Sequence, residues 1–347
     1  MTHNRLTAVP RRHRPGEPRG PAVRPHRASD EVARAARVPQ TAPRLPLLRS
    51  ILVPVDGTPE AEHALPFALA LARRSGAEVM LANVYSAPQG ANDPERLGWR
   101  GGEYLVEPLR EYLDGLTKRV TGAGPVRARP VLLRGYWPED ALCEFGDWGS
   151  DLVVVAARRR GWWSRFRRGS VSAEVARRSR APVLVVPAGG APPDLSAEPP
   201  LGRVLVPLDG SRGAERALGP AAALATLSEG GCDLLHVVRS RPYAVDWSLA
   251  FGGPPTGTPT VPTRDARCYL RGVAGRLRDL SLPARWQVVT DERPTAEAIA
   301  RHAGLIGADV IAMASRGGVG LAGVFRGSLA ARVSRLASVP VLVCRTT

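Results

Sequence analysis

Short runs of apolar and β-branched residues alternate along this chain with longer stretches of helical periodicity. In its C-terminal part the pattern predicts strands at 203–208, 233–238, 284–289, 310–313 and 339–344, and helices at 214–227, 265–280, 295–306 and 328–336. The strands are apolar throughout, as in a parallel sheet whose two faces are both covered by helices. The order of elements therefore predicts an α/β fold, a doubly wound five-stranded parallel sheet of flavodoxin-like topology.

The same pattern occurs twice. The segment 51–58, Ile-Leu-Val-Pro-Val-Asp-Gly-Thr, returns as Val-Leu-Val-Pro-Leu-Asp-Gly-Ser at 204–211, and the strands at 151–155 and 182–186 return at 309–313 and 340–344. We therefore expect two tandem domains of one fold, a first copy at 47–188 and a second copy at 201–347, joined by a Pro-rich linker at 189–200. Differences between the copies are then candidates for divergence in function.

Residues 1–46 do not fit this pattern. They are rich in Arg, Pro, Ala and His and have no sustained apolar period, so we predict a disordered tail. Eleven arginines against three acidic residues give 1–50 a net charge of +8, half of the +16 of the whole chain. The tail is either a solvated extension or an electrostatic arm for nucleic acid, acidic lipid or an acidic partner.

A second basic segment carries the rest of the net charge. Residues 158–180 contain nine arginines and one acidic residue, with aromatic residues among the arginines. The segment of interest, a candidate interaction loop, consists of Arg158, Arg159, Arg160, Trp162, Trp163, Arg165 and Phe166. This mixture suits a membrane interface, a nucleic-acid backbone with base stacking, or a protein partner. The alternative is that the aromatic rings pack on the sister domain and the arginines are solvated.

Composition argues against several other classes of protein. The longest apolar run, 65–72, is too short to cross a bilayer, and no signal-peptide pattern opens the chain, so we expect a cytoplasmic protein. The four cysteines are isolated, as in a reduced protein, and no metal-ligand spacing occurs. His63, His236 and His302 lack a recurring nucleophile or acid partner. We therefore predict no metal site, no catalytic residues and at most slow, incidental ATP hydrolysis.

The residues that predict a binding site follow the strands. In the second copy a glycine-rich loop runs from Ala314 through Gly317 to Gly327 and Ser328, where a helix begins. Glycines let backbone amides approach an anion, and the amides at a helix N-terminus attract phosphate. Asp209 follows the first strand of this copy and should lie across the same crevice, where it can accept from a ribose or hold Mg²⁺ through water. The alternative for Asp209, and for Asp56 of the first copy, is a turn and cap role.

These residues together resemble the tandem form of the universal stress protein family. The resemblance rests on the Val-Pro-x-Asp-Gly-Ser/Thr opening, the Asp-Leu-Val-Val-Val strand, the Gly-Ser after the loop and the Pro-Val-Leu-Val-Val ending, and it covers both copies. It implies the adenine nucleotide alpha-hydrolase-like fold and the binding of ATP or ADP through a loop of form G-x2-G-x9-G-[S/T]. It also implies that the copies pair through their closing strands at 182–186 and 340–344.

The two copies match this family pattern unequally. In the second copy the implied nucleotide-binding residues are Pro207, Asp209, Val237, Ala314, Gly317, Gly327 and Ser328, where Ala314 replaces the first glycine. In the first copy the remaining matches are Asp56, Val84, Gly169 and Ser170, and Arg159 takes the place of the second glycine. We therefore expect ATP or ADP, with Mg²⁺, mainly in the second copy, a stress-response role, and weak or altered binding in the first. The alternative is a nucleotide-independent interaction protein that works through its tail and its interaction loop, and association of two chains into a homodimer stays open.

Overall fold

The computed structural model describes residues 48–85, 100–158, 171–189, 192–239, 263–316 and 328–346. The basic tail lies outside the described residues, and so do Arg159, Arg160, Trp162, Trp163, Arg165 and Phe166 of the candidate interaction loop. The same holds for four residues of the candidate sites, Gly169, Ser170, Gly317 and Gly327. Within the described part of the chain, no helix combines the length and the apolar character that a membrane crossing requires.

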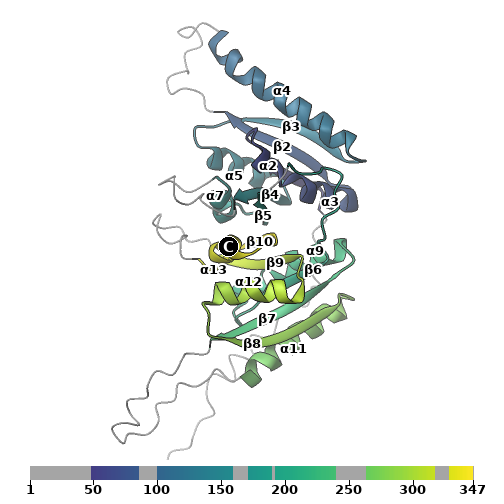
Figure 1. Cartoon of the computed structure of the whole chain (residues 1–347), viewed down its shortest axis with the longest axis vertical. Helices are drawn as coiled ribbons and strands as arrows, with labels where there is room; N and C mark the ends of the chain where they lie inside the picture. Colours follow the sequence, from purple (N-terminus) through teal and green to yellow (C-terminus); the bar gives the residue numbers. More distant parts are fainter. Residues whose placement is uncertain are drawn as a thin grey trace, which may run out of the picture. The chain divides into compact units, whose positions relative to one another are not determined.

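The first copy alternates strands and helices in the order that the sequence predicts (Figure 1). Its elements are β1 (Ser50–Pro54), α2 (Pro59–Glu62), α3 (Leu65–Ser75), β2 (Glu78–Tyr85), α4 (Arg100–Gly122), β3 (Arg127–Arg134), α5 (Pro138–Gly149), β4 (Leu152–Arg158), α7 (Val171–Arg178) and β5 (Val183–Ala188).

The second copy repeats this order. Its elements are β6 (Arg203–Pro207), α8 (Arg212–Glu215), α9 (Leu218–Leu227), β7 (Gly231–Arg239), α11 (Thr263–Asp279), β8 (Ala284–Asp291), α12 (Thr295–Ile306), β9 (Val310–Arg316), α13 (Leu329–Leu336) and β10 (Val341–Thr346). The predicted α/β class with parallel strands is thus confirmed for both copies.

One predicted helix, at 214–227, is divided into α8 and α9. Pro220 has no N–H to donate to the carbonyl of Arg216, so the helical ladder restarts, and the Ala221 N–H donates to the Ala217 carbonyl at 2.9 Å. In the first copy Pro66, the second residue of α3, likewise has no N–H to donate to the carbonyl of Glu62, where α2 ends. A short helix therefore directly follows each Asp-Gly-Ser/Thr turn.

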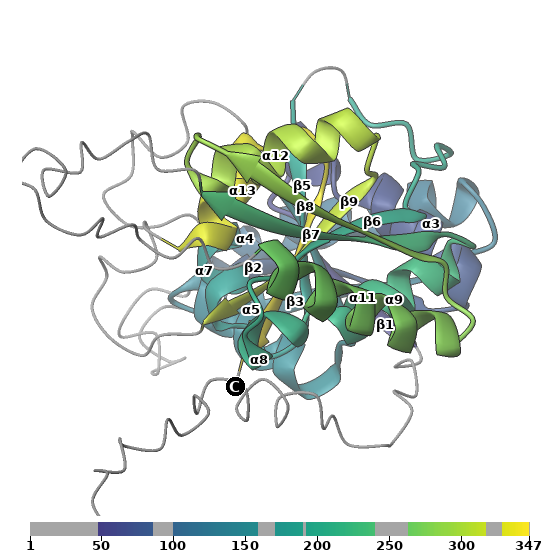
Figure 2. The ribbon, with the colours of Figure 1, turned by 90° about the horizontal axis from the view of Figure 1, so that it is seen from below.

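The described strands form one sheet in the order β3-β2-β1-β4-β5-β10-β9-β6-β7-β8. Within each copy the neighbouring strands are parallel, and the order reverses direction between β1 and β4 and between β6 and β9. The helices that follow β1 and β2 cover one face, and those that follow β3 and β4 cover the other. Figure 2 shows this layering in the second copy, with α12 and α13 on one side of the strands and α9 and α11 on the other.

The two copies are joined by their closing strands. β5 and β10 pair antiparallel, with Leu184 opposite Leu342 and both side chains buried. These are the two strands that the family resemblance leads us to expect at the contact. Two apolar cores, one on each face of the sheet, contain residues of both copies and so continue across this junction.

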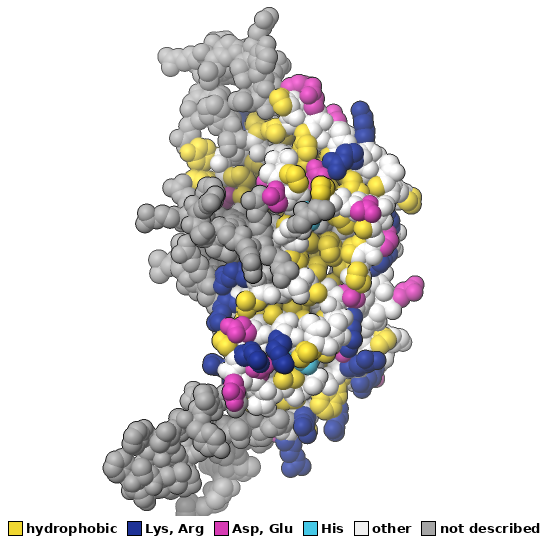
Figure 3. Space-filling model, viewed as in Figure 1, with side chains coloured by type: hydrophobic (Ala, Val, Ile, Leu, Met, Phe, Trp, Pro, Cys, Tyr) yellow, Lys and Arg dark blue, Asp and Glu magenta, His cyan; other side chains and the backbone are white. Residues whose placement is uncertain are grey.

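The charged residues of the second copy gather at its outer edge. Figure 3 shows basic side chains around α11 and β8, all of them arginines, and the exposed ones include Arg264, Arg267, Arg271, Arg278 and Arg285. The guanidinium of Arg271 also lies over the ring of Trp286, 5.9 Å from its centroid. Charge along an edge strand opposes pairing with other strands, so this edge is protected against aggregation.

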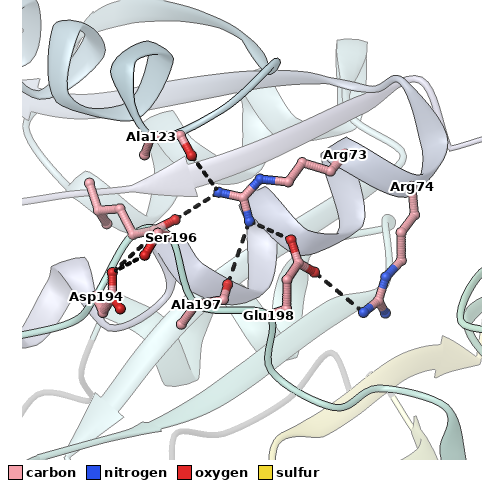
Figure 4. A network of polar contacts seen from close by, with 8 residues as sticks. Arg73, Arg74, Ala123, Asp194, Ser196, Ala197 and Glu198 are labelled. Carbon is pink, nitrogen blue, oxygen red and sulfur yellow. Dashed lines mark hydrogen bonds and ion pairs between the residues drawn. The ribbon is translucent and has the colours of Figure 1, made fainter.

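The linker is held against the first copy by one arginine of α3 (Figure 4). The Arg73 guanidinium donates to the Leu195 carbonyl at 2.7 Å, to the Ala123 carbonyl at 3.2 Å and to the Glu198 carboxylate at 2.6 Å. Arg74 donates to the same carboxylate at 3.4 Å and to Ser228 Oγ of the second copy at 3.0 Å. The Pro-rich segment between the copies is therefore a packed connection.

We expect Arg73→Met to lower the free energy of unfolding by about 2 kcal/mol, because buried carbonyl acceptors lose their donor. Its side chain is only 14% exposed, whereas that of Glu198 is 47% exposed, so most of the loss comes from the carbonyl contacts. Arg74→Met is the matched control and should lose less than about 1 kcal/mol, as exposed ion pairs do. Urea denaturation measures the free energy of unfolding of both variants. Equal losses in the two would contradict the conclusion that Arg73 holds the linker through its carbonyl contacts.

Candidate functional site

Each copy carries an aspartate turn directly after its first strand. Asp209 Oδ1 accepts from the Ser211 N–H at 2.9 Å, and Asp56 Oδ1 accepts from the Thr58 N–H at 2.9 Å and the Thr58 Oγ1–H at 2.5 Å. The glycine between them has a positive φ, +86° at 210 and +84° at 57, a conformation that favours glycine. The turn role weighed for both aspartates is therefore present, through Oδ1 in each case, whereas the N-caps of the helices that follow are Thr58 and Ser211.

The sheet register brings four predicted residues of the second copy to one edge. Pro207 pairs with Leu235, and Leu205 is level with Ile311. Continuing these ladders by a few residues places Asp209 level with Val237 and Leu208 level with Ala314. The carboxyl ends of β6, β7 and β9 thus meet at the switch in strand order, where open parallel sheets bind ligands.

The helix that follows the glycine-rich loop begins at the same edge. Ser328 is the N-cap of α13, and its Oγ accepts from the Ala331 N–H at 3.2 Å. The N–H groups of Leu329 and Ala330 come before the capped Ala331 N–H, at the N-terminal end of this eight-residue helix. Backbone N–H groups at this position attract anions, so the residues present fit the phosphate end of a nucleotide.

The strand next to each aspartate turn, β2 in the first copy and β7 in the second, carries a different side chain at one equivalent position. His236, the residue before Val237, places Nδ1 2.8 Å from the Leu208 carbonyl and so ties β7 to the aspartate turn. Asn83 stands at this position in the first copy, 6% exposed, and its Nδ2 has no hydrogen-bond partner. The first copy therefore lacks this tie and contains a buried donor that is not satisfied.

A triad of Glu, Tyr and Arg side chains, which the sequence analysis did not find, holds the short helix after each aspartate turn. Glu62 of α2 accepts from the Tyr112 hydroxyl at 3.2 Å and from the Arg119 guanidinium at 2.9 Å. The second copy repeats the arrangement with equivalent residues. There Glu215 accepts from the Tyr269 hydroxyl at 2.9 Å and from Arg276 at 3.0 Å.

The triad is electrostatically linked to the aspartate turn. Burial and then the Glu62 charge raise the pKa of the Tyr112 phenol, and Asp56 adds to this shift. In the second copy burial, Glu215 and Asp209 raise the pKa of Tyr269 in the same way. Each triad thus fixes the helix that opens beside the crevice, with neutral phenols donating to a carboxylate. The recurrence of Glu, Tyr and Arg at matching positions is the signal that sequence comparison of the copies could have used.

The histidines and cysteines weighed in the sequence occupy structural positions. The His63 Nδ1 lies 3.0 Å from the Pro59 carbonyl, and desolvation lowers the pKa of the buried His302. Cys143, Cys232 and Cys344 are buried, whereas Cys268 is exposed. Among the described residues, no group of three or more His, Cys, Asp or Glu side chains is placed to hold a metal ion.

The profile of the universal stress protein family matches the chain twice, at residues 48–187 and 200–345. Among curated proteins, the universal stress protein Rv2623 of Mycobacterium tuberculosis is 26% identical over 311 residues. This similarity covers 85% of the present chain and 96% of that protein.

Two solved structures illustrate the range of structural similarity. A universal stress protein of Archaeoglobus fulgidus has a TM-score of 0.62 at 21% identity, covering 85% of this chain and 96% of that one, so the likeness concerns the fold. A universal stress protein in complex with cAMP is 28% identical and covers 41% of this chain and 99% of that one, with a TM-score of 0.33.

Proposed function

Since the chain belongs to the universal stress protein family, in a tandem arrangement of two copies, we propose that it is a regulatory protein that binds ATP or ADP. The nucleotide binds mainly in the crevice of the second copy. The observation that carries this proposal is the meeting of Asp209, Val237 and Ala314 with the N-terminus of α13 at one edge of the sheet.

Each of these groups has a part in the proposed complex. Pro207 and Val237 border the adenosine, and the carboxylate of Asp209 accepts from the ribose or holds Mg²⁺ through water. Ser328 and the amides that open α13 contact the phosphates, together with Gly317 and Gly327 of the loop. When bound, Mg²⁺ neutralises phosphate charge. Ala314, in place of a glycine, lies within β9 and is not among the residues with a positive φ, so its methyl group adds no backbone strain there.

The rest of the proposal follows from the differences between the copies. The first copy, proposed as a domain at 47–188, binds nucleotide weakly or in an altered way, because Arg159 takes the place of the second glycine of its loop. The second domain, at 201–347, binds nucleotide without efficient catalysis, and its conformation or choice of partner carries the signal. We place this protein in a cytoplasmic stress response on the strength of its family.

Thermal or urea unfolding in the presence of ATP tests the proposal. A ligand present at 100 times its dissociation constant should raise the free energy of unfolding by about 2.7 kcal/mol. Val237→Trp fills the base end of the second crevice and should abolish this gain. Val84→Trp is the matched variant of the first copy and should keep most of it.

The result that would overturn the proposal is equally concrete. No stabilisation of the wild-type chain at millimolar ATP or ADP, or an equal gain in the Val237→Trp variant, rules out the second crevice as the nucleotide site. Phosphate release above a blank at a useful rate would instead contradict the absence of efficient catalysis.

A further inference from the structure

One helix of the second copy, α11, concentrates arginine on a single face. Four exposed residues share this face and are called the arginine stripe below: Arg264, Arg267, Arg271 and Arg278. At 3.6 residues per turn their side chains fall within about 60° of the helix circumference and extend along about 21 Å of its length. The acidic residues of the helix, Asp265 and Asp279, lie outside this arc. The stripe is thus a row of positive charge that no carboxylate of its own helix interrupts.

The equivalent helix of the first copy carries no such stripe. The triads align α4 with α11, and the two helices pack on β3 and β8, the edge strands of the sheet. In this alignment Glu107, Asp114 and Thr121 of α4 stand at the positions of the first, third and fourth arginines of the stripe. The remaining position holds Arg110, which pairs with Glu107 at 3.7 Å. Because the same place in the same fold accepts acidic and neutral residues, folding does not require the arginines of α11.

The charges of the stripe are available to a partner. Among the residues that the structure describes, neither Arg264 nor Arg267 has a carboxylate within ion-pair distance. The Arg271 guanidinium lies over the Trp286 ring, 5.9 Å from its centroid. Arg278 donates to the Ala284 carbonyl from Nε at 3.0 Å and from Nη2 at 2.5 Å. These two contacts orient guanidinium groups without neutralising them, so an anion on the stripe would relieve repulsion between like charges.

The surroundings of the stripe decide which class of anion it fits. The apolar face of α11, with Leu270, Val273 and Leu277, is buried in the core, so the helix has no apolar side chain to insert into a lipid surface. A protein partner would need an apolar anchor, yet the described large hydrophobic residue nearest in sequence that is exposed, Leu280, follows the end of α11. A phosphodiester backbone needs only cations, and the planar guanidinium group matches phosphate oxygens.

We propose that the arginine stripe of α11 binds the phosphodiester backbone of nucleic acid, without regard to base sequence. Successive phosphates of one duplex strand are about 3.4 Å apart along the helix axis, so about 21 Å of stripe reaches several of them. The Trp286 ring lies beneath Arg271, so the stripe contacts phosphates and does not stack bases. This interaction goes beyond the proposed binding of ATP or ADP and uses none of the residues of the crevice.

Fluorescence anisotropy of a labelled 30-nucleotide oligo(dT) with the full chain, at several salt concentrations, tests the proposal. The test variant carries Arg264→Gln, Arg267→Gln and Arg271→Gln. Loss of three contacts to a single strand should make the slope of log Kobs against log salt shallower by about 2. The affinity at 0.1 M salt should fall about 10- to 100-fold. The basic tail and the candidate interaction loop are the same in every variant, so their share of the binding cancels.

The matched control variant removes the same charge from exposed positions elsewhere, with Arg110→Gln, Lys118→Gln and Arg301→Gln. It should keep the wild-type slope, and its affinity should fall no more than about threefold. Lysine at the three positions of the test variant keeps the charge and should also keep the slope, because an ammonium group still contacts phosphate. The substituted side chains are exposed, so all variants should melt within a few degrees of the wild type. An oligonucleotide of the same length and mixed sequence should bind within about threefold of oligo(dT).

Several results would overturn the inference. These are an absence of oligo(dT) binding by the wild type, an unchanged slope in the test variant, or equal losses in the test and control variants. Poly-glutamate and vesicles that contain phosphatidylserine are titrated in parallel. If the test variant lost binding to either of these and kept its affinity for oligo(dT), the stripe would belong to an acidic protein or a membrane instead. Val237→Trp should leave oligo(dT) binding unchanged, so the outcome is separate from that of the proposed ATP site.

Discussion

Raising the pH from 9 to 10.5 is expected to lower the free energy of unfolding by about 4 kcal/mol, because buried thiols must keep their protons in the folded chain. Burial raises the pKa of Cys232 and of Cys344 to about 12. In the unfolded chain a thiol titrates near pH 8.5. Above that pH the unfolded chain releases protons that the folded chain retains, so each thiol costs about 1.4 kcal/mol per pH unit.

The direction of this effect follows from the raised pKa values. The stabilisation is complete below about pH 8.5 and is lost progressively as the pH rises toward the folded pKa near 12. Cys143 adds to the loss, since burial raises its pKa to about 11, although partial solvation weakens its share. The raised pKa values of Tyr112 and Tyr269 extend the loss above pH 10. A total stability of about 5–15 kcal/mol is typical, so this loss is a large share of what holds the chain folded.

Urea denaturation under reducing conditions at pH 8, 9, 9.75 and 10.5 measures this dependence. The variant with Cys232→Ala and Cys344→Ala should be less stable at pH 8 but show a shallower decline between pH 9 and 10.5. Cys268→Ala, which changes an exposed thiol, should follow the wild-type curve. A pH-independent midpoint, or a decline of the same slope in the double variant, would show that these thiols are not the cause.

The order of elements could be predicted because it depends on local periodicity. Buried parallel strands are apolar at every position, and helices show a 3.6-residue period, so both are visible in single sequences. The division of the helix at 214–227 was missed, although Pro220 is visible and its missing N–H is the reason. The pairing of β5 with β10 followed from the family resemblance, since apolar strands alone do not reveal their partners.

The candidate site could be predicted only in part. Asp209 follows β6, and Val237 and Ala314 lie near the carboxyl ends of β7 and β9, which must meet in a parallel sheet, so topology places them together. The triads were missed because each joins side chains at least 50 residues apart in sequence, a contact that no local pattern encodes.

A sequence motif does not always mark the site, as the aspartate before β4 shows. Asp151 opens the Asp-Leu-Val-Val-Val strand that marks the family resemblance, and its Oδ2 accepts from the Arg49 N–H at 2.8 Å and the Ser50 N–H at 2.9 Å. Asp309 accepts from the Arg203 N–H at 2.8 Å in the same way. Both aspartates hold the start of the neighbouring strand, at the end of the sheet opposite the crevice.

The triads give the second large effect. Glu62→Gln should lower the free energy of unfolding by about 2–3 kcal/mol, because a buried acceptor loses the charge that strengthens its bonds to Tyr112 and Arg119. The Arg119 side chain is 52% exposed, which limits the loss to less than that of a fully buried pair. Glu215→Gln should lose about 1–2 kcal/mol, because the Glu215 side chain is 20% exposed against 10% for Glu62.

The two variants control for each other, since stability and ATP binding should rank them in opposite orders. Glu215 holds α8, which begins three residues after Asp209, so Glu215→Gln should weaken ATP binding by the second copy several-fold. Glu62→Gln acts on the first copy and should leave that affinity unchanged despite its greater cost in stability. Urea denaturation and ATP titration of both variants separate the two effects. If Glu62→Gln weakened ATP binding more than Glu215→Gln, in line with its greater loss of stability, the triad would support the fold alone. A positioning role requires that only the change in the second copy weakens ATP binding.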